Sequence, residues 1–281
     1  MLVVFQAPER LAMSFPIAMS KDVMARSVRR SLGTLACLLM ALSIGSERVP
    51  RRNPDRMKVI PSFVLWAWER PEDLRFINPN DTAVAFLANT IRLHLQRVIV
   101  RPRLQPLMVP EGTKLIAVVR IEADSDAAFD DSQITDAVAA ILSRAALPRV
   151  VAVQIDFDAA RSQRVFYRAL LLELRQRLAK EVPISITALA SWCLDDDWIS
   201  TLPVDEAVPM LFRMGAGTND VVARLTSGRD FQAKLCQESL GVSTDERWAS
   251  LPGGRRLYVF RSRSWTEQSE LTFLAEVQPW R

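Results

Sequence analysis

The sequence has very little histidine: its 281 residues include one histidine, three cysteines and nine glycines. Zinc sites and Ser–His–Asp triads need histidine or paired cysteines, and neither a CxxC nor an HExxH pattern occurs. The histidine, His94, lies in a helical or strand-like stretch without a nearby carboxylate motif, so we interpret it as a packed surface residue. No GxGxxG or GxxxxGK loop follows an expected strand. We therefore expect no metal and no cofactor, and acid–base chemistry would fall to carboxylates.

The positive charge is unevenly distributed. The net charge is +4, but residues 1–56 hold nine Lys and Arg against four Asp and Glu, whereas the remaining residues hold 27 against 28. The body is thus nearly neutral, and its charge implies no nucleic-acid partner. Hydrophobic residues make up 49% and charged residues 24%, which is typical of a globular protein and excludes a disordered chain.

The N-terminal segment has the pattern of a targeting signal. The uncharged run 31–45 follows three arginines and ends in small residues. This pattern predicts a secretory signal peptide, since the run is short for a membrane span of about 20 residues. The alternative is an uncleaved anchor in the inner membrane, with the rest facing the periplasm. We divide the chain into a misannotated extension (1–23), a signal peptide or anchor (24–46), a linker (47–58) and one barrel domain (59–281).

Export would place the remaining cysteines in an oxidising compartment. Cys193 and Cys236 are the two that lie beyond the leader, and they form either a disulfide or two buried thiols. The sequence leaves both alternatives open.

From Val59 onward, short apolar runs alternate with amphipathic stretches. The expected strands are Phe63–Trp68, Ala83–Leu87, Val98–Arg101, Leu115–Ile121, Val150–Phe157, Ile184–Leu189, Ala207–Phe212 and Leu257–Phe260. The expected helices are Ser132–Ala145, Ala159–Leu178, Gly217–Leu225 and Ser264–Val277. Apolar strands separated by helices indicate a parallel sheet covered on both faces. Eight strands in about 225 residues predict an α/β fold, a (β/α)₈ TIM-like barrel with irregularities, and an open doubly wound sheet is the alternative.

The strand 150–157 carries polar residues on one face. Alternation places Gln154, Asp156 and Asp158 together at its carboxyl end, where such barrels hold their active sites. Two nearby carboxylates raise one another's pKa, as acid–base catalysis requires. Alternatively, Asp158 caps the helix that begins near Ala159, and Asp156 pairs with an arginine or binds backbone amides.

Other strand ends supply further candidates. Five of the seven tryptophans lie at or after expected strand ends: Trp66, Trp68, Trp192, Trp198 and Trp265. Of these, Trp68, Trp192 and Trp265 are candidate sugar-binding residues, although Trp192 also fits a buried helix layer. Arg213 binds a substrate carboxylate or pairs with Asp156 or Asp158. The remaining candidates are carboxylates, namely Glu69, Asp245 and Glu246.

The segments VQIDFDA, SITALASWC, VDEAVPMLFRMG, GVSTDE and LYVF resemble an uncharacterised bacterial family, domain of unknown function 3142, from about Val59 to the end. The family is similar in layout to glycoside-hydrolase TIM barrels. IDFDAA also resembles the chitinase-type motif Asp-x-Asp-x-Glu, with Asp156 and Asp158 at the aspartate positions. Ala160 stands where that motif has its catalytic glutamate, so the acid comes from elsewhere or the barrel only binds.

Two hypotheses follow. The first is an exported, periplasmic or secreted, glycoside-hydrolase-like barrel that acts on or binds an envelope or extracellular polysaccharide. Its expected catalytic residues are Asp156 and Asp158 with Glu246 or Glu69. The second is a non-catalytic glycan-binding or envelope-assembly protein on the same fold. Asp156 and Asp158 in one open cleft with tryptophans and a third carboxylate would favour catalysis. In both, the partner is carbohydrate, and the membrane is contacted only through an uncleaved leader.

Overall fold

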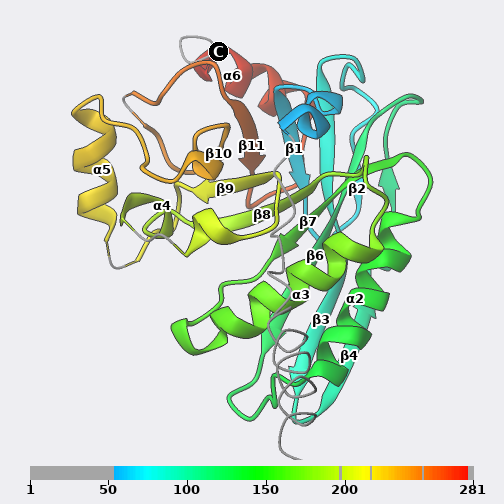
Figure 1. Cartoon of the computed structure of the whole chain (residues 1–281). Coiled ribbons are helices and arrows are strands. Elements are labelled where there is room, and N and C mark those ends of the chain that lie inside the picture. Colours follow the sequence, from blue (N-terminus) through cyan, green and yellow to red (C-terminus); the bar gives the residue numbers. More distant parts are fainter. Residues whose placement is uncertain (1–53, 196–197, 216, 249, 278–281) are drawn as a thin grey trace, which may run out of the picture. The chain divides into compact units, whose positions relative to one another are not determined.

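The computed structural model describes residues 54–195, 198–215, 217–248 and 250–277, so the predicted leader lies outside the described residues. Eight parallel strands form a closed barrel (Figure 1). They are β1 (Phe63–Ala67), β3 (Thr82–His94), β6 (Leu115–Ala123), β7 (Val150–Asp156), β8 (Ile184–Leu189), β9 (Glu206–Met210), β10 (Ser239–Ser243) and β11 (Arg256–Phe260). Because β1 pairs with both β11 and β3, the ring closes, which confirms the predicted TIM-like barrel over an open sheet.

One expected strand lies outside the barrel, and one barrel strand was not among those expected. The expected strand 98–101 is β4 (Arg97–Pro102), which pairs antiparallel with β3 in a hairpin and lies outside the ring. The hairpin turns at Leu95, whose φ of 48° places it in the left-handed region. The missed barrel strand is β10, where Ser239, Gly241 and Ser243 interrupt the apolar run. Those three residues point into the barrel and alternate with Leu240 and Val242, which lie on the outer face. A search for apolar runs alone does not detect such a strand.

One side of the barrel extends past its rim. The strand β3 is far longer than the expected 83–87, and after an irregularity between Leu87 and Asn89 it continues beside β6 as far as Ala123. Because β7 ends opposite Arg120, the last residues of β3 and β6 stand beyond the end of β7 and form a wall there. A separate two-stranded sheet joins β2 (Glu72–Asp73) to β5 (Leu107–Met108).

Helices surround the barrel unevenly. They are α2 (Asp131–Ala145), α3 (Arg164–Arg177), α4 (Trp192–Asp195), α5 (Thr218–Thr226) and α6 (Glu267–Val277). Short 3₁₀ turns are η1 (Pro54–Val59), η2 (Arg161–Gln163), η3 (Ile199–Thr201) and η4 (Lys234–Cys236). Figure 1 shows α2 and α3 side by side outside β6 and β7. In the described part of the chain no α-helix lies between β1 and β3 or between β10 and β11, so the barrel is irregular.

Local sequence explains where the two longest helices form. Asp130 caps α2 by accepting a hydrogen bond from the Gln133 amide, whose side chain accepts one from the Phe129 amide. In α3 the four-residue spacing of Phe166, Leu170 and Leu174 places these side chains on the buried face, as predicted.

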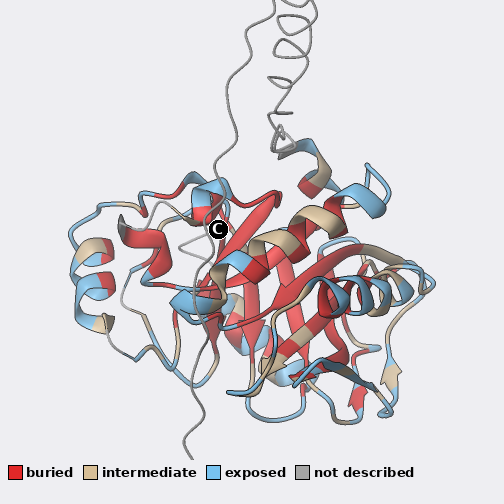
Figure 2. Cartoon of the chain, turned by 60° about the horizontal axis from the view of Figure 1, so that its bottom comes forward, coloured by how far each residue is buried: buried red, intermediate tan, exposed pale blue. Residues whose placement is uncertain are grey.

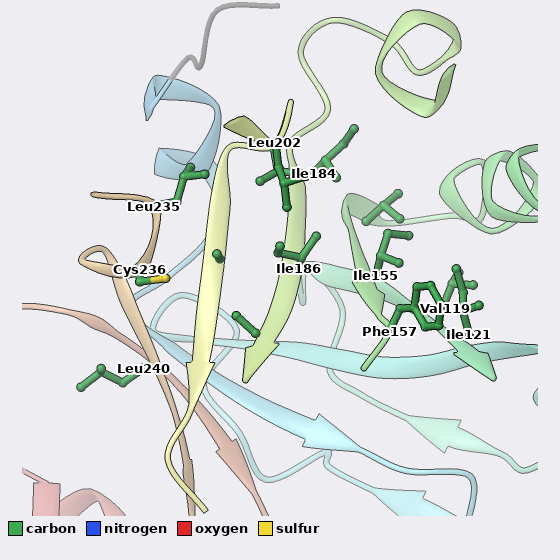
Figure 3. Packing of buried hydrophobic residues seen from close by; sticks show 14 of the residues in the cluster. Val119, Ile121, Ile155, Phe157, Ile184, Ile186, Leu202, Leu235, Cys236 and Leu240 are labelled. Carbon is green, nitrogen blue, oxygen red and sulfur yellow. The ribbon is translucent and has the colours of Figure 1, made fainter. Parts of the chain in front are cut away.

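Two apolar clusters hold the fold together. The larger lies between the strands and the surrounding helices, where buried residues gather on the inner sides of the elements (Figures 2 and 3). The smaller fills the barrel and includes Trp66, Val118 and Tyr258. A disulfide joins Cys193 in α4 to Cys236 in η4, with Cα atoms 5.9 Å apart. Among the described residues, no helix is long and apolar enough to cross a membrane.

Candidate active site at the barrel mouth

The polar face of β7 points into the barrel at two depths. Gln154 lies deep inside, where its amide nitrogen donates to Ser185 Oγ at 3.1 Å and its oxygen accepts from the Trp66 indole at 3.0 Å. Both of its polar ends are therefore used within the core. The predicted alignment of three polar residues holds, but Gln154 belongs to the packing of the barrel. Along β7, Asp156 is the first of the three polar residues to lie at the mouth of the barrel.

Asp156 is buried, with 8% of the residue exposed, and is held on both oxygens. Arg120 Nη1 donates to its Oδ2 at 3.0 Å, and Thr187 Oγ1 donates to its Oδ1 at 2.8 Å. Burial raises the pKa of Asp156, and nearby Asp158 raises it further, against the opposing influence of Arg120 and Thr187. The arginine that pairs with Asp156 is thus Arg120 and not Arg213, because Arg120 faces inward on the adjacent strand β6.

Asp158 lies past the end of β7 and is exposed. It shares with Asp156 an open pocket of about 320 Å³ at the wall formed by β6. We call this the acidic pocket, and its polar lining comprises Arg120, Glu122, Asp156, Asp158 and Gln163. Asp158 does not cap the helices that follow it, because the N-cap residues of η2 and α3 are Ala160 and Gln163.

Glu122 is a site residue that the sequence reasoning missed. It accepts a hydrogen bond from Arg120 Nε at 3.1 Å, so one guanidinium bridges Glu122 and Asp156. The signal was present in the sequence, because strand alternation in LIAVVRIEA places Arg120 and Glu122 on one face. The expected strand ended at Ile121, whereas β6 continues to Ala123 and so includes Glu122.

Two further pockets continue around the mouth. The apolar pocket, of about 410 Å³, lies at the ends of β8 and β9 and is lined chiefly by apolar residues with Arg213. The arginine pocket, of about 200 Å³, lies at the ends of β9, β10, β11 and β1. Its lining comprises Trp68, Arg70, Phe212, Arg213, Ser243, Asp245, Phe260, Arg261 and Ser262. The candidates Trp68, Arg213 and Asp245 therefore meet there, apart from the acidic pocket.

Two of the three proposed sugar-stacking tryptophans are packed inside the protein. Trp192 is buried in α4 against Trp198, with ring centroids 5.0 Å apart. Trp265 is also buried, and its indole donates to the Trp66 carbonyl at 3.0 Å. Both rings are packed against protein and line none of the acidic, apolar and arginine pockets. Trp68 is half-buried and lies edge-on to Trp66.

The remaining carboxylates do not join the aspartate pair. Glu69 is exposed after β1 and is absent from the linings of the acidic, apolar and arginine pockets. Glu246 accepts a hydrogen bond from the Arg213 amide at 2.9 Å and faces α6 together with Trp248. Glu122, and neither Glu69 nor Glu246, is thus the carboxylate that lines the acidic pocket with Asp156 and Asp158.

The interpretation of His94 as distant from carboxylates was wrong. His94 ends β3, and its Nδ1 lies 2.9 Å from Asp124 Oδ2 and 3.3 Å from Asp126 Oδ1. The aspartates follow β6, which runs beside β3, so distant sequence positions meet. Arg92 already binds the Asp124 carboxylate, and this ion pair lies on the rim extension, away from the residues of the acidic pocket.

The protein is an irregular, closed parallel α/β barrel, and the ends of its strands carry an acidic pocket and an arginine-rich pocket. Residues 111–213 match the model of a family described as a domain of unknown function (DUF3142). This match confirms the predicted resemblance over a shorter stretch than expected, from the loop before β6 to Arg213. It contains every residue that lines the acidic pocket. Comparison with curated proteins and with solved structures finds no match.

Proposed function

We propose that this protein is an exported barrel enzyme that hydrolyses a polysaccharide at the acidic pocket. The observation that carries the proposal is the position of Asp156 and Asp158 in one open pocket at the strand ends, with burial raising the pKa of Asp156. A carboxyl with a raised pKa keeps its proton to higher pH and so suits the role of general acid, while an ionised carboxylate serves as base or nucleophile. Asp156 takes the first role, and Asp158 or Glu122 takes the second.

Arg120 is central to this assignment. Its guanidinium touches both Asp156 and Glu122, so it fixes their relative positions and balances negative charge when one of them ionises. Proton release from Asp156 during leaving-group departure would then be stabilised by a cation already in contact with its Oδ2.

The disulfide supports the exported setting. Protein disulfides persist in the periplasm and outside the cell, whereas cytosolic thiols stay reduced. The pair Cys193–Cys236 joins α4 and η4 at the outside of the barrel. Together with the charged and then apolar leader of the sequence, it favours a periplasmic or secreted location.

The test is release of reducing ends from a panel of plant, algal and bacterial envelope polysaccharides by the full chain. We expect Asp156→Asn and Asp158→Asn each to lower the rate by about 100-fold or more. Glu122→Gln identifies whether Glu122 or Asp158 is the base, through the larger loss. Asp136→Asn, an exposed change on α2, is the matched control and should leave the rate unchanged. Undiminished hydrolysis by both aspartate variants would refute catalysis at the acidic pocket.

A non-catalytic glycan-binding protein is the second candidate. The observation that favours it is Ala160, which lines the acidic pocket at the position of the catalytic glutamate in the chitinase-type motif. This proposal expects measurable glycan affinity with no turnover of any polymer in the panel, and loss of that affinity in Asp158→Ala.

A further inference from the structure

The barrel mouth is polarised in charge. The acidic pocket has three carboxylates against one arginine, at the ends of β6 and β7. The arginine pocket, across β9, β10, β11 and β1, has three arginines against Asp245. The lining of the apolar pocket between them includes Arg213 and no carboxylate. A linear ligand that follows the strand ends therefore passes from a pocket lined mainly by carboxylates to one in which arginines outnumber carboxylates in the lining.

Arg213 differs from the two other arginines of the arginine pocket. Arg70 is bound by Glu72 and by the carbonyls of residues 261–263. Arg261 donates to the Ser264 carbonyl and lies over the Trp265 ring. Within the described residues, the Arg213 guanidinium has neither a hydrogen bond nor an ion pair with protein, although it lines two pockets. The whole Arg213 guanidinium is therefore available to a ligand.

The backbone holds Arg213 in an uncommon conformation. Its φ is 49°, a left-handed value that costs a non-glycine residue free energy. The amide is fixed there by its hydrogen bond to Glu246, which explains the position of that carboxylate. Glu246 thus helps to fix the backbone of Arg213, whose exposed side chain lines both the apolar and the arginine pocket.

Aromatic side chains line the arginine pocket together with this cation. Phe212 and Phe260 have ring centroids 4.7 Å apart, and Trp68 lies 6.5 Å from Phe260. Phe260 is buried, whereas Trp68 and Phe212 are half-buried and present ring surface to the pocket. Ring faces of this kind bind the apolar C–H face of a pyranose, and Asp245 supplies an exposed acceptor for its hydroxyls.

We propose that this half of the mouth is a subsite for an acidic sugar, whose carboxylate pairs with Arg213 while its ring lies on Trp68 and Phe212. The inference rests on the proposed function and names its substrate class as a uronic-acid-containing polysaccharide. A planar guanidinium binds a carboxylate through two parallel hydrogen bonds, which a neutral ester does not reproduce. Recognition should therefore depend on the charge of the sugar.

The experiment compares acid and methyl-ester forms of the same oligomers. The probes are galacturonate, mannuronate, guluronate and hyaluronate oligosaccharides, titrated calorimetrically into the full chain at low ionic strength. We expect at least one acid form to bind about tenfold or more tightly than its methyl ester, a difference of about 1.4 kcal/mol. Arg213→Gln should abolish this preference, and Arg213→Lys should keep part of it. Arg97→Gln, an exposed change at the tip of the rim extension, is the control.

The outcomes separate this inference from the enzyme proposal. Equal affinity for acid and ester in every pair, no binding of any probe, or an acid preference that survives Arg213→Gln would each overturn the subsite. Hydrolysis of neutral polymers that depends on Asp156 and Asp158 would then leave the enzyme proposal standing alone. Conversely, an acid preference lost in Arg213→Gln, without any turnover, would retain the subsite and reject the hydrolase.

Discussion

Glu206→Gln should destabilise the fold more than any conservative surface change. Glu206 is fully buried inside the barrel, where it accepts hydrogen bonds from Ser185 Oγ at 3.0 Å and Tyr258 Oη at 2.8 Å. Its other oxygen pairs with the Arg256 guanidinium, whose side chain is 12% exposed. The substitution preserves the shape of residue 206 but removes its charge and places an amide donor among these donors.

The size of the loss in stability depends on which hydrogen-bond partners Arg256 loses and which it keeps. Removal of one partner from a buried ion pair costs about 3–5 kcal/mol, because the other charge stays desolvated. Arg256 also donates to the carbonyls of Met57, Ile60 and Pro61 in the segment that closes the base of the barrel. These acceptors keep part of the guanidinium satisfied, so we expect the lower end, about 3 kcal/mol, with a fall in Tm of about 6–12 °C.

Urea unfolding followed by tryptophan fluorescence measures the change in the free energy of unfolding. Glu111→Gln, at an exposed turn, is the matched control and should cost less than about 0.5 kcal/mol. Arg256→Met completes a double-mutant cycle with Glu206→Gln, and the double variant should be more stable than the sum of the single losses predicts. A cost below about 1 kcal/mol for Glu206→Gln, or strict additivity in the cycle, would refute the reasoning.

Three further predictions concern the disulfide, the acidic pocket and the barrel wall. Cys193→Ser with Cys236→Ser opens a loop closed over a sequence separation of 43 and should lower the free energy of unfolding by about 4 kcal/mol, with reductant reproducing the loss in the unmodified chain. Because folding raises the pKa of Asp156, the free energy of unfolding should fall as pH rises from about 4 through the raised value. Asp156→Asn should remove this fall. Parallel profiles of unfolding free energy against pH for the variant and the unmodified chain would contradict the prediction. Gly241→Ala would place a Cβ 2.6 Å from the Met210 sulfur, so unfolding titrations should show a loss of about 1 kcal/mol as that flexible side chain moves.

The sequence predicted the barrel well because apolar periodicity is a local property. The strands 115–121, 150–157 and 184–189 and the helix faces follow from it, with ends within a few residues. It failed at β4 and β10, because pairing direction and small inward residues depend on neighbours in space. The strand β4 is a hairpin partner of β3, and β10 carries serine and glycine on its inner face.

The candidate site, like the fold, was predicted from the sequence only in part. The position of Asp156 and Asp158 at the mouth follows from alternation and from the rule that such barrels place functional groups at strand ends. Which arginine pairs with Asp156 depends on strand order, which brings Arg120 on β6 beside β7 and leaves Arg213 two strands away. Trp192 and Trp265 show the same limit, since a tryptophan after a strand faces either the mouth or the helix layer.

The sequence by itself determined an α/β barrel, a carboxylate pair at one strand end and the chemistry available without histidine. Each depends on residue type and spacing along the chain. Only the tertiary structure decided that Glu122 joins the pair, that Gln154 is a core residue and that His94 meets Asp124. It also decided that the Arg213 guanidinium lines two pockets without a protein partner among the described residues. These are contacts between strands far apart in sequence, and barrel closure and register, which set them, are properties of the whole sheet.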